Sequence, residues 1–325
     1  MPPPPLDFSR LRTLPLSARA NKVRLDDFAP VPADADLPDV LALFPAILIG
    51  EEFGVFVRAV CDARRAGRPF VLMIGGHVIK TGMSRLIIDL MRRGLVSHLA
   101  ANGSVSVHDW EIALIGQTSE DVAVYLPDGR FGNWEETGAG LNAAVNEGAR
   151  AGLGYGTAMG KAIAEGAFPH ADASVFAGAF RLGVPATVHV ALGNDIIHQH
   201  PSWDPALMGA ATGRDFHLLT RTVADLDGGA LMNLGSAVIL PETFLKALSV
   251  ARNLTGGRPR EFHNAVFDMV RQYRPLVNVA GRPTASGGPG ARGFVFTGHH
   301  EILFPLFCCA LRREWAAGNG AGAAP

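Results

Sequence analysis

The hydrophobic pattern of this chain alternates between short apolar runs and stretches whose apolar residues recur at helical spacing. The apolar runs predict buried strands at residues 70–74, 96–101, 186–191, 230–234 and 275–280. The stretches with helical spacing predict helices at residues 39–66, 83–93, 109–115, 173–182, 215–225, 241–253 and 300–315. Alternating strands and helices are typical of a parallel sheet covered on both faces. The sequence therefore predicts an α/β fold with a doubly wound, mostly parallel sheet.

The ends of the chain depart from this rhythm. Residues 1–37 hold several prolines without clear periodicity, so a flexible Pro-rich arm is expected there. Residues 126–170 are expected to be mainly helical with glycine interruptions. No repeat or linker divides residues 38–316, which are predicted to form one domain. Residues 317–325 are predicted to be a flexible tail.

Glycines and polar residues follow several predicted strands directly. In open α/β sheets, ligands bind in a crevice outside the carboxyl ends of the strands. Four segments have this placement: GGHVIKTG at 75–82, NGSVSVHDWE at 102–111, GNDIIHQHPSW at 193–203, and Gly235-Ser236 together with the later His299-His300 pair. We expect them to contribute to one shared site.

In the first segment, Gly76 allows a ligand to approach the backbone closely. Thr81 precedes a helix whose free N–H groups favour a phosphate. Lys80 can pair with that phosphate, or form an imine with a carbonyl substrate if its pKa is lowered. The alternative is an ordinary turn with a surface lysine. The segment, which also contains His77, matches neither the G-x-G-x-x-G fingerprint nor a P-loop.

The second segment places Asn102 and Gly103 at a strand end and His108 close behind. A histidine can act as general acid or base near neutral pH. Asp109 is equally well explained as a helix cap or as a ligand contact. Four polar groups together, Glu111 included, favour a ligand pocket over an isolated cap.

The third segment combines a carboxylate, two histidines and a tryptophan. Asp195 can hold a ribose hydroxyl or an amine. In an extended chain His198 and His200 project the same way, which permits metal ligation, although substrate or cofactor contact is favoured. Trp203 can stack on a ring or a cation, or simply fill the core.

The last segments are less specific. Gly235 and Ser236 form another strand-end turn, for which glycine packing is the alternative explanation. His299 is explained equally well by surface capping and by membership of the site. No G-x-S-x-G motif supports a hydrolase triad.

Composition and charge exclude several function classes. The 325 residues are 48% hydrophobic, enough for a large core. A formal net charge of -1 without a basic stripe argues against nucleic acid as a partner. No apolar stretch approaches the roughly 18–20 residues of a membrane span. Three cysteines form neither a disulfide framework nor a zinc pattern, so a cytoplasmic location is expected.

At these residues the chain resembles the deoxyhypusine synthase family. The resemblance rests on the order of diffuse motifs across about residues 39–313: GGHVIKTG, HLAANG, GNDI, GSAV, NVAG and GHHEILFPLF. It implies a doubly wound NAD-binding fold and a homotetramer with sites at subunit interfaces. It also implies that Asp195 contacts amine and cofactor, and that GSAV and NVAG supply cofactor contacts at Gly235, Ser236, Asn278 and Ala280.

One departure from that family concerns its catalytic lysine. The family carries this lysine beside a tryptophan in a late loop, before the last strand and helix. Here that loop is GRPTASGGPGARG, with neither residue, and no lysine follows Lys246. Aminobutyl transfer onto a protein lysine, which is deoxyhypusine synthesis itself, is therefore not expected.

A second resemblance is to NAD-dependent ornithine cyclodeaminase domains, and it rests on AANGSVSVHDWEIAL at residues 100–114. Those enzymes oxidise an amino group, lose ammonia and reduce the imine. The resemblance implies that Lys80, His77, His108 and Asp109 suit such chemistry at least as well.

The leading hypothesis is an NAD-dependent, homotetrameric enzyme that acts on a small amine or amino acid through an imine, as in aminoalkyl transfer of the homospermidine synthase type. Its predicted catalytic residues are Lys80, His108 and Asp195. Its predicted cofactor contacts are Gly76, His77, Thr81, Asn102, Gly103, Asp109, Gly235, Ser236, Asn278 and Ala280. Its predicted substrate contacts are His198, His200, Trp203 and His299. No resident metal is expected.

Three alternatives remain open. The first is an ornithine cyclodeaminase-like ammonia lyase. The second is a non-catalytic, NAD-binding tetramer, which the missing lysine favours. The third is a metal site built from His77, His198 and His200.

Overall fold

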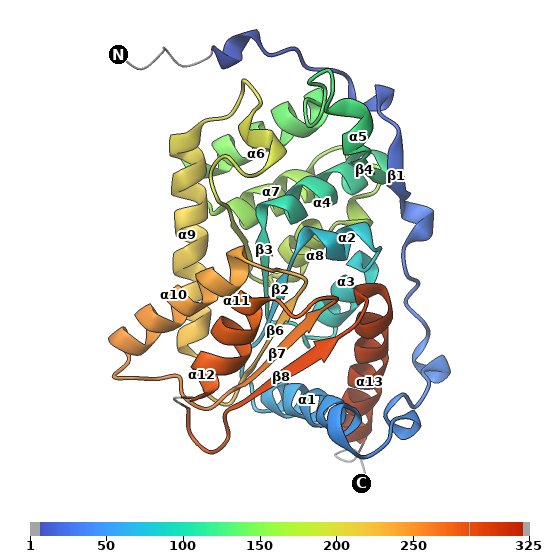
Figure 1. The fold of residues 1–325 in the computed structure, drawn as a ribbon, viewed down its shortest axis with the longest axis vertical. Helices are drawn as coiled ribbons and strands as arrows, with labels where there is room; N and C mark the ends of the chain where they lie inside the picture. The colour runs from blue at the N-terminus through green and yellow to red at the C-terminus, as the bar shows by residue number, and fades with distance from the viewer. Residues whose placement is uncertain (1–6, 286, 321–325) are drawn as a thin grey trace.

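The computed structural model describes residues 7–285 and 287–320 and confirms the predicted α/β fold. Six parallel strands form one sheet with helices on both faces (Figure 1). The strands are β2 (Phe70–Ile74), β3 (His98–Asn102), β5 (Ala186–His189), β6 (Ala230–Leu234), β7 (His263–Asp268) and β8 (Arg292–Thr297).

The central strand β2 shows why the apolar runs become buried strands. All five of its residues are buried, and Leu72 pairs with Leu99 of β3 and Met232 of β6. Leu72 packs into the core cluster formed with α1 and α13, whereas Val71 and Met73 pack into the cluster formed with α9 and α10. An apolar residue is thus needed at every position, because both faces of the sheet are covered.

The strand order is β5-β3-β2-β6-β7-β8. From β2 the chain builds outward through β3 to β5, then returns to the other side of β2 and continues through β6, β7 and β8. This is the 3-2-1-4-5-6 order of a Rossmann-like sheet, whose ligand crevice lies at the carboxyl ends of the strands where the order reverses. Here that point lies between β2 and β6.

The helices that surround the sheet fall into two layers with further helices at its carboxyl edge (Figure 1). The longer ones are α1 (Leu48–Arg65), α3 (Ser84–Arg92), α4 (Gly103–Ile115), α6 (Glu135–Arg150), α7 (Tyr155–Glu165), α8 (Val175–Leu182), α9 (Pro205–Ala224), α10 (Ile239–Leu254) and α13 (His300–Gly320). The short ones are α2 (Gly76–Lys80), α5 (Val122–Tyr125), α11 (Tyr273–Pro275) and α12 (Arg282–Ala285). None of the helices in the described ranges is long and apolar enough to cross a bilayer.

One predicted strand is wrong. Residues 275–280 belong to α11 and to the π-helix η8 (Leu276–Gly281), not to the sheet. A short apolar run does not distinguish a strand from a buried helical turn. The strands of this region are β7 and β8, which the sequence pattern did not predict. The helix predicted at residues 39–66 begins only at Leu48, after the 3₁₀ turn η5 (Leu41–Leu43).

Much of the segment predicted as a flexible arm packs on the domain. Strand β1 (Asn21–Arg24) pairs antiparallel with β4 (Gln117–Glu120), and Leu16 joins Trp134 in a small apolar cluster. Residues 1–6 of the arm lie outside the described residues. Of the predicted tail, residues 317–320 belong to α13 and residues 321–325 lie outside the described residues.

Candidate functional site

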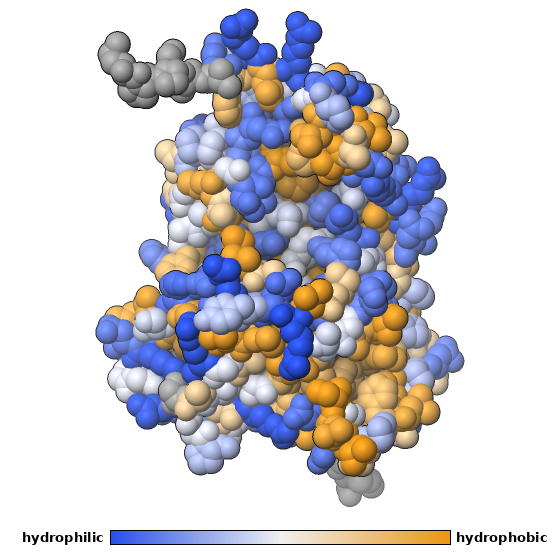
Figure 2. All heavy atoms as spheres, viewed as in Figure 1, coloured by the Kyte–Doolittle hydropathy of each residue, from blue (hydrophilic) through white to orange (hydrophobic). Residues whose placement is uncertain are grey.

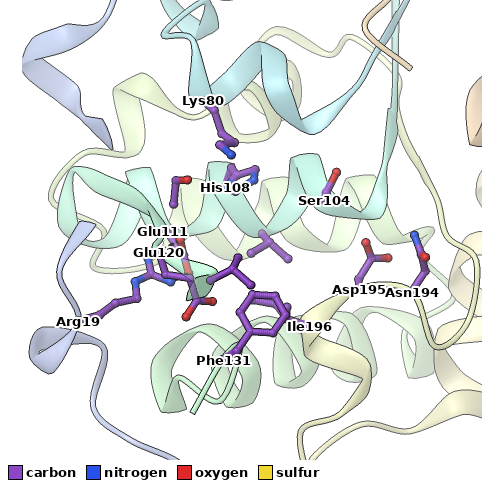
Figure 3. A pocket seen from close by; sticks show the side chains of 13 residues that line it. Arg19, Lys80, Ser104, His108, Glu111, Glu120, Phe131, Asn194, Asp195 and Ile196 are labelled. Atoms are coloured by element: carbon purple, nitrogen blue, oxygen red, sulfur yellow. Dashed lines mark hydrogen bonds and ion pairs between the residues drawn. The ribbon is translucent and has the colours of Figure 1, made fainter. Parts of the chain in front are cut away.

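A cavity of about 230 Å³ lies beside the carboxyl ends of β3 and β5 (Figure 3). Its lining comes from the N-terminal segment, α2, α4, β4, α5 and the loops around residues 131 and 195. The residues are Arg19, Lys80, Ser104, Val107, His108, Glu111, Ser119, Glu120, Val122, Phe131, Asn194, Asp195 and Ile196. The three residues predicted to be catalytic, Lys80, His108 and Asp195, therefore line the same cavity.

Two glycines let the strand-end loops approach one another. A Cβ atom on Gly103 would collide with the carboxylate of Asp195, and one on Gly76 would collide with the Ser104 side chain. The same Cβ on Gly76 would lie 3.3 Å from Cδ2 of His108. Both glycines thus bring protein groups together at the cavity, because a larger residue would hold them apart.

The loop that carries Asp195 is held by His198. Nδ1 of His198 accepts hydrogen bonds from the backbone N–H groups of Gly193 and Asp195, at 3.2 and 3.1 Å. His198 is itself buried and packs on Trp203, with ring centroids 5.0 Å apart. These two predicted substrate contacts therefore support the loop and do not line the cavity. Burial raises the pKa of Asp195 to about 6.

His108 takes part in a series of hydrogen bonds that connects it to Glu111, another residue of the cavity wall. Its Nδ1 lies 2.8 Å from Oγ1 of Thr118, and this hydroxyl donates to Oε2 of Glu111 at 2.6 Å. Burial lowers the pKa of His108 to about 4. At neutral pH the imidazole is therefore uncharged.

Glu111 is paired with Arg19 from the N-terminal segment. The shortest N–O distance is 2.6 Å, and both side chains are 1% exposed. Arg19 and Thr118 are site residues that the sequence pattern did not reveal. No local signal marks them, because Arg19 is 92 positions away from Glu111 along the chain.

The remaining charged groups of the cavity are Lys80 and Glu120. Within the described residues, Lys80 forms no ion pair, and its amino group points toward His108 (Figure 3). Glu120 accepts from the backbone N–H of Gly132 and from Nε1 of Trp134, at 3.1 and 2.9 Å. Burial raises the pKa of Glu120. The cavity thus offers the amino group of Lys80, which no side chain of the described residues pairs with, together with carboxylates.

Apolar side chains border the cavity as well. Phe131 and Ile196 contribute to its wall. Figure 2 shows a hydrophobic patch over α5, where Val122, Val124 and Leu126 are exposed. Because Val122 also lines the cavity, this patch adjoins it.

A second polar cluster occupies the carboxyl ends of β6, β7 and β8. The rings of His77 and His300 lie 5.4 Å apart, and Nε2 of His300 is 3.7 Å from Oδ1 of Asp268. His300 is 1% exposed, and neither ring nitrogen has a hydrogen-bond partner within the described residues. Gly235, at a φ of 68°, leaves room for this ring.

His300, and not His299, is the histidine of this pair that enters the crevice. The side chain of His299 is 65% exposed and lies 3.6 Å from the carboxylate of Glu301. The sequence reveals the pair but not which member points inward, since that depends on where α13 begins.

Several residues predicted to contact the cofactor instead form hydrogen bonds with other groups of the protein. Asp109 is completely buried and accepts from Oγ of Ser174 and from the N–H of Val175, so it stabilises the start of α8. Asn102 caps α4. Thr81 and Ser236 also form hydrogen bonds within their own turns. The hydroxyl of Thr81 donates to the carbonyl of residue 77, and the hydroxyl of Ser236 accepts from the N–H of residue 240.

Other predicted residues lie away from the cavity. Nδ2 of Asn278 donates to Glu242 at 2.8 Å, and Ala280 packs closely against Gly293 at the beginning of β8. His200 is buried against α6, where its Nδ1 pairs with Ser202 at 2.8 Å. No group of three His, Cys, Asp or Glu side chains in the described ranges is arranged to hold a metal ion.

The late loop without lysine is also remote from the cavity in this chain. Among its described residues, Gly287 approaches the carbonyl of Arg260, and Gly288 approaches the carboxylate of Glu261. Both contacts lie just before β7, at the amino edge of the sheet. The absence of a lysine from this loop therefore does not alter the residues that line the cavity of the same chain.

Comparison with known proteins gives a likeness of fold. No protein-family model and no curated protein sequence matches the chain. Unliganded AgrE matches with a TM-score of 0.52 and 14% identity over 89% of this chain and 34% of AgrE. The ternary complex of AgrE with ornithine and NAD+ matches with a TM-score of 0.51 and 14% identity over 83% of this chain and 33% of AgrE.

The chain spans about a third of the length of these AgrE structures. A putative deoxyhypusine synthase from Entamoeba histolytica also matches, at 9% identity over 79% of this chain and 86% of that one. Its TM-score of 0.45 is too low to support an argument. These comparisons show a Rossmann-like fold shared with an NAD+-binding protein.

Proposed function

We propose that this chain is an NAD-dependent enzyme that oxidises the amino group of a small amine or amino acid to an imine. The observation that carries the proposal is the convergence of Lys80, His108 and Asp195 on one cavity at the carboxyl edge of a Rossmann-like sheet. Ligands of such sheets bind at this edge. The fold shared with AgrE, which forms a complex with ornithine and NAD+, supports the same assignment.

The carboxyl edge suits a dinucleotide because it presents buried polar atoms that accept or donate no hydrogen bond within the described residues. Both ring nitrogens of His300 and Oδ1 of Asn233 are of this kind within the described residues. Buried polar groups usually have hydrogen-bond partners, so a ligand is a natural complement. The residues that would hold NAD are His77, Asp268 and His300, with Gly235 leaving room at the turn. When bound, NAD supplies the acceptor for the hydride removed from the carbon that bears the amine.

Lys80 and Asp195 would orient an amino-acid substrate. The unpaired ammonium of Lys80 is placed to bind a carboxylate, and the carboxylate of Asp195 is placed to bind the amine. An ammonium group must lose a proton before its carbon can be oxidised. Asp195, with a pKa near 6, is ionised at neutral pH and can accept that proton.

The size of the cavity favours one fate for the imine. At about 230 Å³ it is below the usual range of roughly 300–1,000 Å³ for ligand pockets. It therefore suits one small molecule better than a donor and an acceptor together. This favours a cyclising or ammonia-releasing reaction within a single substrate over aminoalkyl transfer to a second amine.

A turnover assay of the full chain tests the proposal. With NAD+ and a panel of diamines and basic amino acids, we expect substrate-dependent release of ammonia or formation of NADH. We expect Lys80→Gln to raise KM for amino acids, because it removes carboxylate binding. Absence of NAD+ binding at millimolar concentration, measured by calorimetry, would rule the proposal out.

A further inference from the structure

We propose that Arg19 is a positioning residue that acts through Glu111 and Thr118 to keep His108 in the tautomer whose Nε2 accepts hydrogen bonds from the cavity. The catalytic meaning of this arrangement rests on the proposed function. The hydrogen-bond chain itself is independent of it.

Glu111 is saturated with donors. Its Oε1 accepts from Nη1 of Arg19 at 2.8 Å and from the hydroxyl of Thr137 at 2.9 Å. Its Oε2 accepts from Nη2 of Arg19 and from the hydroxyl of Thr118, both at 2.6 Å. A guanidinium group does not lose its proton in proteins. The buried carboxylate beside it therefore stays ionised and can only accept.

The direction of the remaining hydrogen bonds follows from this. Because ionised Glu111 cannot donate, the hydroxyl hydrogen of Thr118 points to Glu111 and the hydroxyl oxygen accepts from Nδ1–H of His108. A neutral imidazole carries one ring proton. Nε2 of His108 therefore keeps its lone pair, and within the described residues no partner occupies it.

The N-terminal segment holds two residues of this hydrogen-bond series, Arg19 and Thr118, in place. It supplies Arg19, whose Nε donates to Asn21 at 2.7 Å. It also supplies β1, in which Val23 pairs with Thr118 of β4. The position of the Thr118 hydroxyl and the charge of Glu111 thus both depend on this segment.

Removing Arg19 should reverse the donor and acceptor roles in the hydrogen bonds between Glu111, Thr118 and His108. Glu111 would be left as a buried carboxylate without its cation, and such a group takes up a proton from solvent. Protonated Glu111 can donate to Thr118, and Thr118 can then donate to Nδ1 of His108. The ring proton exchanges through solvent onto Nε2, and the acceptor that faces the cavity becomes a donor.

The charges around His108 come from several elements. Lys80 and His77 of α2 and Arg19 of the N-terminal segment disfavour its protonation, whereas Glu111 on its own helix favours it. Changes in Lys80 should therefore alter the pKa of His108 but leave the order of donors and acceptors unchanged. The two effects can be separated by reading the tautomer directly.

The test is ¹⁵N NMR of the full chain labelled at histidine, with His108→Gln used for assignment. We expect the Nδ1–H tautomer in the wild type and a shift toward Nε2–H in Arg19→Gln. Arg19→Lys should retain most of the wild-type signal. Lys22→Gln, which removes an exposed ion pair from the same segment, should change nothing. A wild-type protein with Nε2–H, or an unchanged signal in folded Arg19→Gln, would overturn the proposal.

Thr118 provides a second route if Arg19→Gln does not fold. Thr118→Val removes the buried hydroxyl at nearly constant volume, so we expect a mixture of the two tautomers. Thr118→Ser should restore the single Nδ1–H tautomer of His108. Equal spectra for Thr118→Val and Thr118→Ser would contradict the proposed hydrogen bonds through Thr118. None of these signals requires NAD. Failure of NAD+ binding with an intact tautomer pattern would overturn only the proposed function.

Discussion

Burial sets the charge of the individual residues in this site. It lowers the pKa of His108 and raises that of Asp195 to about 6. At pH 7 the cavity therefore holds a neutral imidazole and an ionised Asp195, beside the amino group of Lys80. A base whose pKa lies near the working pH suits proton removal from an ammonium group.

Asp195→Asn is the first test at this scale. We expect turnover to fall by about 10²–10⁴-fold, because the amide cannot accept the substrate proton. The wild-type rate should rise with pH through about 6, as Asp195 ionises. Asp172→Asn, an exposed site in the same chain, serves as the control. A rate profile of wild-type shape in Asp195→Asn would exclude Asp195 as the base.

The raised pKa of Asp215 predicts that the stability of the protein depends on pH. Burial raises its pKa to about 7, whereas an unfolded aspartate titrates near 3.9. Between these values the unfolded chain ionises while the native one keeps its proton. The free energy of unfolding therefore falls with rising pH in this window, by up to about 1.4 kcal/mol per pH unit, and levels off above it.

Asp215→Asn should remove this dependence. Oδ2 of Asp215 accepts from the N–H groups of Gly156 and Val188, and Oδ1 has no partner within the described residues. An asparagine can keep the accepting oxygen and cannot ionise. We expect its melting temperature, relative to the wild type, to be higher at pH 7.5 than at pH 4.5. The same difference at both pH values would show that Asp215 is not the titrating group.

At the scale of elements, strands that are apolar along most of their length were predictable, whereas β7 and β8 were not. FVLMI and ALMNL predict β2 and β6 with their observed bounds, since both strands are buried throughout. In β7 the apolar run covers only residues 265–267, because His263, Asn264 and Asp268 are polar. The side chain of buried Asn264 donates to the carbonyl of Val279. That hydrogen bond joins the π-helix η8 to β7.

Gly103→Ala tests how α4 and the loop after β5 fit together. The added methyl group would collide with Asp195, so we expect at least a tenfold lower kcat/KM. Helix propensity alone favours alanine over glycine by about 1 kcal/mol. Gly209→Ala in α9, where a Cβ meets nothing, isolates that gain. Equal activity of the two variants in steady-state kinetics would contradict the role given to this contact.

At the scale of the whole molecule, parallel topology was the predictable part of the site. Carboxyl ends of parallel strands share one edge, so Lys80 and Asp195 could be expected together from the sequence. Arg19 could not, because its role depends on the N-terminal segment folding back along β4. Asn278 and Ala280 were assigned to the cofactor through the resemblance of NVAG to a family motif, whereas in the structure Asn278 contacts Glu242 and Ala280 packs against Gly293.

Substitution of His300 tests the proposed role of the second polar cluster in NAD binding. We expect His300→Ala to weaken NAD+ binding about tenfold, because it removes two buried nitrogens that face the carboxyl edge. His217→Ala, an exposed histidine on α9, should bind as the wild type does. Calorimetric titration of both variants with NAD+ measures the difference, and equal affinities would remove His300 from the cofactor site.

The most direct measurement is a crystal structure of the full chain grown with saturating NAD+. We expect the dinucleotide across the carboxyl ends of β2 and β6, with its nicotinamide ring facing the cavity of Lys80 and Asp195. A dinucleotide bound elsewhere, or a crevice that stays empty at saturation, would contradict it.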